Sequence, residues 1–175
     1  VLFRSGGASR RPSGLFGDFQ PLIRIRTTMP ASVHINEQLA LRVQHHTGRL
    51  ALSEFANLID HYEANPRVFR FDVIHLLDET ATFDFGIEEI PPLKAKFAGL
   101  IKAANLPIVL RSVWVCPSPS AWSVLETWLF ERHSLDGLHT EVSLIATLEE
   151  ARAIFEEDEL NAVRAMRGFR PYFST

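Results

Sequence analysis

Residues 69 to 78 have the sequence Phe69-Arg70-Phe71-Asp72-Val73-Ile74-His75-Leu76-Leu77-Asp78, in which large apolar and β-branched side chains are interrupted only by Arg70, Asp72 and His75. A strand covered by helices on both faces has this near-continuous apolar composition, because neither face meets water. The run ends at Asp78, a residue type that favours turns. It therefore predicts an inner strand of a parallel sheet.

Four other segments of the chain also have strand patterns. Val33–Ile35 and Leu39–His45 are short alternating runs on either side of a polar turn, and together they predict a β-hairpin. Ile108–Val115 is a second buried strand by the same criterion as residues 69–78. In residues 138–144, apolar and polar side chains alternate, which predicts a half-exposed strand at a sheet edge.

Helical patterns separate these strands. Residues 53–64 repeat apolar side chains at helical spacing, behind an expected N-cap at Ser53. A second helix is expected near residues 88–104, with two prolines in its first turn and Phe97 in the middle of its apolar stripe. Ser118-Pro119 is a good N-cap and N1 pair for a third helix. Thr147 to Glu150 forms a capping box that starts a fourth, which kinks or continues beyond Phe155.

The resulting order is β-β-α-β-α-β-α-β-α, which predicts one α/β domain with a mostly parallel sheet of about five strands, covered by four or five helices. The domain is expected to span residues 29–175, with its core in 31–165 and an irregular tail after Gly168. Residues 1–28 lack a regular apolar period, which predicts a flexible and dispensable extension. If the natural chain starts at Met29, this extension is not native.

Composition narrows the classes of function. With 46% apolar and 22% charged residues, the chain resembles an ordinary globular protein. A single cysteine excludes an internal disulfide, and we found neither a membrane-spanning apolar run nor a secretory signal, so a cytoplasmic location is expected. Residues 1–28 carry a net charge of +4 and the remainder −7, and an acidic domain repels phosphate backbones. Nucleic-acid binding and membrane insertion are therefore not expected.

This layout resembles the STAS superfamily, the fold of bacterial anti-sigma-factor antagonists, and more closely its SpoIIAA-like subgroup. Ile74–Asp78 looks like the strand of that family that ends in Asp, and Thr147–Phe155 looks like its last strand-to-helix segment. The resemblance covers about residues 32–156. It implies a single α/β domain that acts by binding a partner.

The antagonists carry a phosphorylatable serine in a segment resembling D-S-S-G-L. The matching stretch here is Asp84-Phe85-Gly86-Ile87, with Phe85 at the serine position, so the resemblance does not carry over a serine switch. Thr80 and Thr82 lie just upstream and are the hydroxyl residues that could replace it, although loop threonines usually serve in turns.

Ligands of parallel α/β sheets bind at the edge formed by the carboxyl ends of the strands. Two loops are expected there, one after each buried strand. We call the edge they form the rim. Its candidate binding residues are Asp78, Thr80, Thr82, Asp84, Phe85, Gly86, Cys116, Ser118 and Ser120.

The chain lacks the motifs of several enzyme and cofactor classes. It contains no G-x-G-x-x-G, no G-x4-G-K-[ST] and no G-x-S-x-G, so no cofactor is expected. The adjacent His45 and His46 would face opposite sides of a strand, and we expect no metal site.

Two functions remain. The first is a non-enzymatic regulatory or interaction module that binds an unknown protein partner or small ligand at the rim, with a homodimer left open. The alternative is a small thiol-dependent enzyme that uses Cys116 near a helix N-terminus, supported by Asp78 or Asp84. A thiol nucleophile generally needs a base, and no histidine can be placed beside Cys116 from the sequence.

Overall fold

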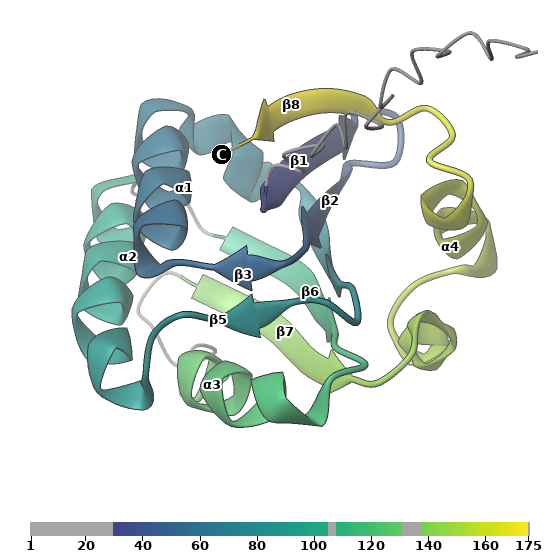
Figure 1. Ribbon diagram of the computed structural model, residues 1–175. Coiled ribbons are helices and arrows are strands. Elements are labelled where there is room, and N and C mark those ends of the chain that lie inside the picture. The colour runs from purple at the N-terminus through teal and green to yellow at the C-terminus, as the bar shows by residue number, and fades with distance from the viewer. Residues whose placement is uncertain (1–29, 105–107, 131–137, 175) are drawn as a thin grey trace, which may run out of the picture.

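The computed structural model describes residues 30–104, 108–130 and 138–174, which form a three-layer α/β domain (Figure 1). Its central layer is a mixed six-stranded sheet in the order β7-β6-β4-β2-β1-β8. Strands β2, β4, β6 and β7 are parallel, whereas β1 is antiparallel to both of its neighbours. The strands are β1 (Ala31–Asn36), β2 (Leu41–His46), β4 (Asp72–Leu77), β6 (Ile108–Val115), β7 (Leu138–Ile145) and β8 (Arg170–Ser174).

Helices cover both faces of this sheet. Three of them, α1 (Leu52–Ala64), α2 (Ile90–Ala104) and α3 (Pro119–Leu129), lie on one side in Figure 1. The opposite side carries η4 (Leu148–Ala153), a 3-10 helix, and α4 (Glu157–Arg164). The expected alternation of strands and helices is confirmed, including the β1–β2 hairpin, the strand Ile108–Val115 and the edge position of β7.

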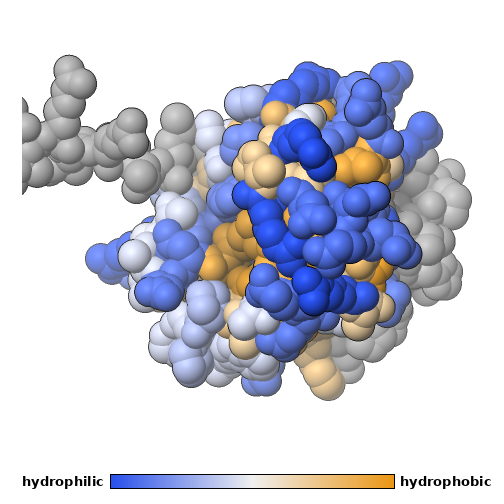
Figure 2. Space-filling view, turned by 90° about the vertical axis from the view of Figure 1, so that its right-hand side faces the viewer, coloured by the Kyte–Doolittle hydropathy of each residue, from blue (hydrophilic) through white to orange (hydrophobic). Residues whose placement is uncertain are grey.

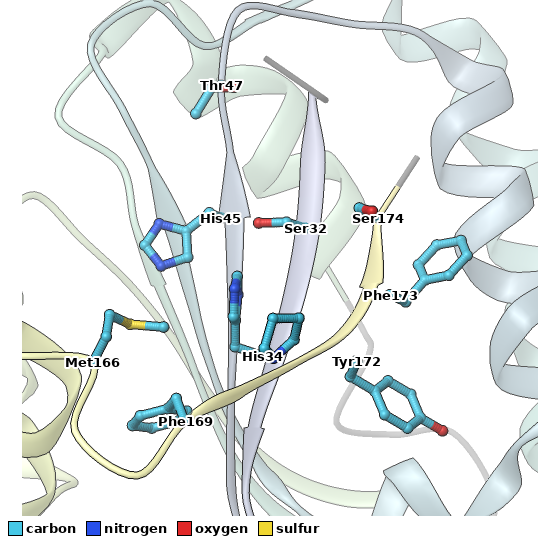
Figure 3. Close-up of a pocket in the computed structure, with 10 residues that line it drawn as sticks. Ser32, His34, His45, Thr47, Met166, Phe169, Tyr172, Phe173 and Ser174 are labelled. Atoms are coloured by element: carbon cyan, nitrogen blue, oxygen red, sulfur yellow. The ribbon is translucent and has the colours of Figure 1, made fainter. Parts of the chain in front are cut away.

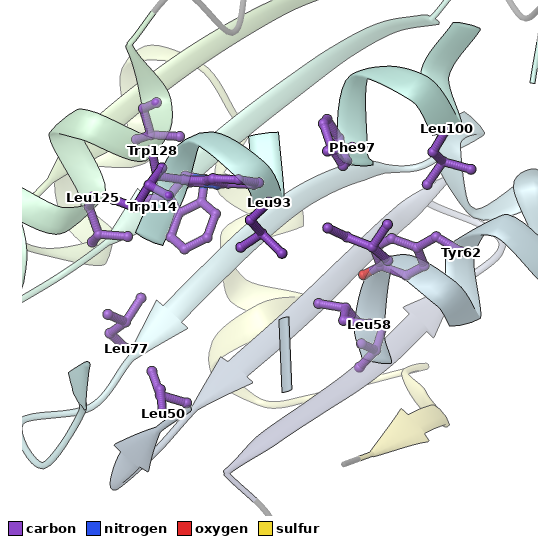
Figure 4. Close-up of a cluster of buried hydrophobic side chains, with 14 of the residues drawn as sticks. Leu50, Leu58, Tyr62, Leu77, Leu93, Phe97, Leu100, Trp114, Leu125 and Trp128 are labelled. Atoms are coloured by element: carbon purple, nitrogen blue, oxygen red, sulfur yellow. The ribbon is translucent and has the colours of Figure 1, made fainter. Parts of the chain in front are cut away.

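The larger core lies between the sheet and the helices α1 to α3. Figure 4 shows leucine and aromatic side chains from these helices and from β4 and β6 converging there. The expected stripe on α2 is confirmed, because Leu93, Phe97, Leu100 and Ile101 are all buried. A smaller core under η4 and α4 contains Leu41 and Val43 of β2. Side chains of β2 thus alternate between the two cores, as the pleat of a strand requires.

One inner strand is shorter than predicted. Residues 69–71 do not belong to it, because Pro66–Arg70 forms a 3-10 helix, η1, and β4 begins at Asp72. Pro66 has the backbone angle of a helical first turn, and the amide of Phe71 then donates to the Val68 carbonyl. Phe69 is buried as expected, together with Val68, but from a helical turn.

The ends of the helices differ in detail from the sequence pattern. Helix α1 is capped at Ala51 and not at Ser53: the Glu54 carboxylate accepts the Ala51 amide at 2.8 Å. The capping box at Thr147 is confirmed, since Glu150 accepts hydrogen bonds from its backbone amide and hydroxyl. It starts only the short η4, and α4 begins separately after Glu156.

The C-terminal segment is a strand, and the expected irregular tail is wrong. β8 pairs with β1, so the sheet has six strands where about five were expected, and the packed part of the domain reaches past residue 165. The turn into β8 uses Gly168 at φ +79°, a left-handed conformation that glycine adopts without strain. Beside it, the Asn36 side-chain amide donates to the Arg167 carbonyl at 3.2 Å.

Two very short strands were not predicted. β3 (Arg49–Leu50) and β5 (Thr82–Phe83) pair in parallel as a separate two-stranded sheet. Runs of two residues have no detectable period, so pattern analysis cannot find them. The expected extension at 1–28 lies outside the described residues. Among the described helices, none has both the length and the apolar composition needed to cross a bilayer.

Candidate functional site

The two predicted rim loops leave the sheet at the same edge. Leu76 of β4 lies opposite Val115 of the parallel strand β6, so Asp78 and Cys116 follow on the same side. Trp122 of α3 anchors the second loop by donating from its indole nitrogen to the Cys116 carbonyl at 3.0 Å. The topology therefore brings together the segments that the sequence placed there.

The first rim loop is held by its own polar groups. The Asp78 carboxylate accepts hydrogen bonds from the amide and the hydroxyl of Thr80, at 2.9 and 2.6 Å. The Thr80 hydroxyl oxygen in turn accepts the Gly48 amide at 2.9 Å, which links this loop to the turn after β2. Thr80 therefore serves as a turn residue, as loop threonines usually do.

The small β3–β5 sheet fixes the rest of this loop. Thr82 lies in β5 opposite Arg49, whose guanidinium forms an ion pair with Asp84. The Asp84 amide donates to the Leu50 carbonyl at 2.8 Å. Gly86 stands at the start of the short 3-10 helix η2 (Ile87–Glu89), where its amide donates to Glu89. The acids and hydroxyls of the loop are exposed although its backbone is bonded at both ends.

Phe83 and Phe85 anchor the loop to the larger core. Their rings contact each other at 5.3 Å between centroids, and both rings contact Phe55 of α1. Together with residues of α2 and α3, they bound a cavity of only about 10 Å³. An internal volume of this size holds about one water molecule, so the two rings pack as loop anchors and do not line a crevice.

In the second rim loop, the thiol of Cys116 is buried. Its sulfur lies 3.3 Å from the Ser118 carbonyl oxygen, and burial raises the pKa of the thiol. Ser118 caps α3 as predicted, although its hydroxyl pairs with that of Ser120 at 2.8 Å and makes no capping bond to the helix backbone.

An open groove lies elsewhere, on the face of β1 and β2 that α4 leaves uncovered. Figure 3 shows Ser32, His34 and His45 on its floor, with Met166 and Phe169 at one side and Tyr172 and Phe173 of β8 at the other. In Figure 2, apolar residues on the face that carries α4 lie in a recess between hydrophilic side chains. None of the described residues that line the groove carries a carboxylate, and its two histidine rings meet edge to face at 5.9 Å between ring centroids.

No group of three or more metal-ligating side chains comes together among the described residues. As predicted, His45 and His46 face opposite sides of β2. His46 is buried among Phe55, His75 and Trp114, with its ring stacked on all three. Burial lowers the pKa of His46 to about 4, so its ring is neutral near pH 7.

A row of buried polar side chains under α1 and α2 escaped sequence analysis. Arg42, Gln44 and His46 lie on the face of β2 that the larger core covers, and each is at most 5% exposed. The signal was present, since every second residue of β2 is polar. That alternation predicted a strand of a β-hairpin but not the burial of its polar face, because cores cover both faces of β2.

No family model, curated protein or solved structure matches the chain. The architecture supports a single α/β domain with a mixed six-stranded sheet.

Proposed function

We propose that this chain is a non-enzymatic, STAS-like interaction module, and that it binds a basic segment of a protein partner at the rim. The layout of strands and helices is compatible with that fold family. The proposal depends most on one observation: an exposed acidic loop is held in one conformation by the β3–β5 sheet and by the Asp78–Thr80–Gly48 hydrogen bonds.

A loop that is ordered before binding loses little conformational entropy when a partner docks. Residues 78–86 are fixed at three points: by the Asp78 carboxylate, by pairing with β3 and by the partly buried Phe83 and Phe85 rings. Their exposed groups are therefore presented in a constant arrangement. Preorganisation of this kind favours recognition of a specific partner surface.

Charge suggests the chemistry of the partner. Five acids, Asp78, Glu79, Asp84, Glu88 and Glu89, lie at or beside the rim and are exposed. Of these, Asp84 is paired with Arg49. Complementary charge raises association rates and selects partners, so lysine and arginine side chains are the expected counterparts.

The thiol-dependent enzyme receives less support. Cys116 is buried, and its raised pKa leaves the sulfur protonated near pH 7, whereas a nucleophile must be a thiolate. No histidine contacts the thiol among the interactions of the described residues. Action at the rim is therefore expected to proceed without covalent chemistry at Cys116.

The test uses a partner captured with the full chain as bait and then purified. Dissociation constants would be measured for the wild type and for Glu79→Lys, Glu63→Lys and Cys116→Ser. Glu79 and Glu63 are both exposed, but Glu63 lies on α1. We expect Glu79→Lys to weaken binding roughly tenfold, equivalent to about 1.4 kcal/mol, with a weaker dependence on salt.

The matched control Glu63→Lys makes the same change of charge away from the rim and should leave the dissociation constant within about twofold. Cys116→Ser should also be silent. Equal effects of Glu79→Lys and Glu63→Lys would show that net charge alone acts, and an effect of Cys116→Ser alone would favour the enzyme.

A further inference from the structure

The buried polar row on β2 continues across two neighbouring strands. Gln44 lies opposite His75 of β4, and His75 lies opposite Trp114 of β6. Their side chains share the face covered by α1, α2 and α3. There, the rings of His75 and Trp114 stack with 3.6 Å between their centroids. Together with Arg42, two residues before Gln44, they form a polar cluster inside an otherwise apolar core.

Arg42 is a buried cation without a carboxylate partner among the described residues. Its guanidinium lies over the rings of Tyr62 and Phe69, at 5.0 and 5.8 Å from their centroids, and Nη1 donates to the Val68 carbonyl at 3.3 Å. Its Nε has no hydrogen-bond partner in the described part of the protein. Burial lowers the pKa of Arg42, and the charge of Asp72 offsets this only in part; both oxygens of Asp72 accept bonds from Arg111. A buried charge left in this state is costly.

Two further groups beside Arg42 have unused hydrogen-bonding capacity. Gln44 is 1% exposed, and neither its amide nitrogen nor its amide oxygen bonds to any described residue. The indole nitrogen of Trp114, 2% exposed, is also without a partner within the described ranges. Buried polar groups in folded proteins are nearly always hydrogen-bonded, so such a cluster points to a bound species.

Arg42, Gln44 and Trp114 border a common cavity of about 40 Å³. Its other walls are mainly apolar and aromatic, from α1, α2 and α3, and Figure 4 draws Leu58, Tyr62, Phe97 and Trp128 among them. The polar wall offers N–H donors from a guanidinium, an amide and an indole, and carries one full positive charge. The volume corresponds to only a few water molecules or three to four heavy atoms.

We propose that this cavity binds a small planar oxyanion, of the class of formate, bicarbonate and nitrate, through Arg42, Gln44 and Trp114. An oxyanion supplies the negative charge that Arg42 lacks and acceptors for all three donors. The three or four heavy atoms of such an anion match the volume of about 40 Å³, and its flat π-system can stack on the aromatic side chains that α1 and α2 contribute to the lining. The site lies inside the larger core and is independent of partner binding at the rim.

The test follows the tryptophan indole N–H resonances of the ¹⁵N-labelled full chain during titration with sodium formate. The Trp114 resonance, assigned through its loss in Trp114→Phe, should shift and saturate at millimolar formate. The Trp122 resonance should stay in place, because that N–H already donates to the Cys116 carbonyl. Sodium nitrate should reproduce the shift, and sodium chloride at the same ionic strength should not.

Gln44→Leu replaces the amide with an apolar group of similar size and should weaken formate binding at least tenfold. An unchanged Trp122 resonance would show that this variant is folded. The matched control is Ser112→Ala: Ser112 is equally buried and its hydroxyl is unpartnered within the described residues, but it does not border the cavity. Its formate affinity should equal that of the wild type.

Three results would overturn the proposal. The first is a Trp114 resonance that formate does not move, which would show that the cavity holds water alone. The second is an identical saturable shift with chloride, which would exclude selection for planar oxyanions. The third is a Gln44→Leu variant that binds formate within twofold of the wild type.

Discussion

At the scale of the residue, His46 makes stability depend on pH. Burial, with a smaller contribution from His45, lowers its pKa to about 4, whereas an unfolded chain has the ordinary value of 6.5. Below pH 6.5 the unfolded state therefore binds a proton that the folded state does not. The stability that His46 contributes is complete above pH 6.5 and is lost as the pH falls towards 4.

Through His46, the wild type should lose about 2 kcal/mol of unfolding free energy between pH 7.5 and pH 5, because pH 5 lies about 1.5 units below the pKa of 6.5 in the unfolded chain. We expect His46→Leu to lack this part of the loss. Urea titrations of both proteins at the two pH values measure this difference. Burial also lowers the pKa values of His45 and His61, so some acid sensitivity should remain. A variant as acid-sensitive as the wild type would show that His46 does not cause the effect.

At the scale of the element, α2 offers two substitutions with opposite expected effects. Phe97 is 7% exposed and its ring meets those of Phe69 and Trp128, so Phe97→Ala should cost roughly 3 to 5 kcal/mol in a denaturant titration.

Two residues on, Gly99 is exposed and an added Cβ would meet no atom within 4 Å. Gly99→Ala should stabilise the protein by roughly 0.5 to 1 kcal/mol. A loss below about 1 kcal/mol for Phe97→Ala would contradict the packing of α2.

At the scale of the whole molecule, β8 joins the C-terminal end of the chain to its first strand and to α1. Figure 1 shows β8 beside β1, with the chain end near α1, where Phe173 stacks on His61 at 4.0 Å between ring centroids. Deleting residues 170–175 removes this strand and two partly buried aromatic rings. We expect the deletion to lower the free energy of unfolding by about 3 kcal/mol. The melting temperature should therefore fall by roughly 6 to 12 °C.

The control for this deletion is Arg170→Ala, which removes only the exposed ion pair with Glu37. Exposed pairs contribute little, so the melting temperature should change by less than about 4 °C. If the deletion is no more destabilising than Arg170→Ala, β8 is not part of the stable domain.

Local patterns predicted the elements well where the residues themselves dictate the conformation. Ile108–Val115 is a strand over its full predicted length, and Pro91 and Pro92 stand in the first turn of α2 as expected. The gathering of the Asp78 and Cys116 loops at one edge was also predictable, because parallel strands end on the same side.

What the sequence by itself determined was therefore the class of fold and the position of the rim, since apolar period, proline and capping residues act over a few neighbouring residues. Only the tertiary structure decided the rest. β8 exists through pairing with β1, and its turn depends on Asn36 and Arg167, which are 131 residues apart. Arg42 and Gln44 likewise became interior groups only when α1 and α2 closed over β2, because burial depends on what packs against a face and not on the residues of that face.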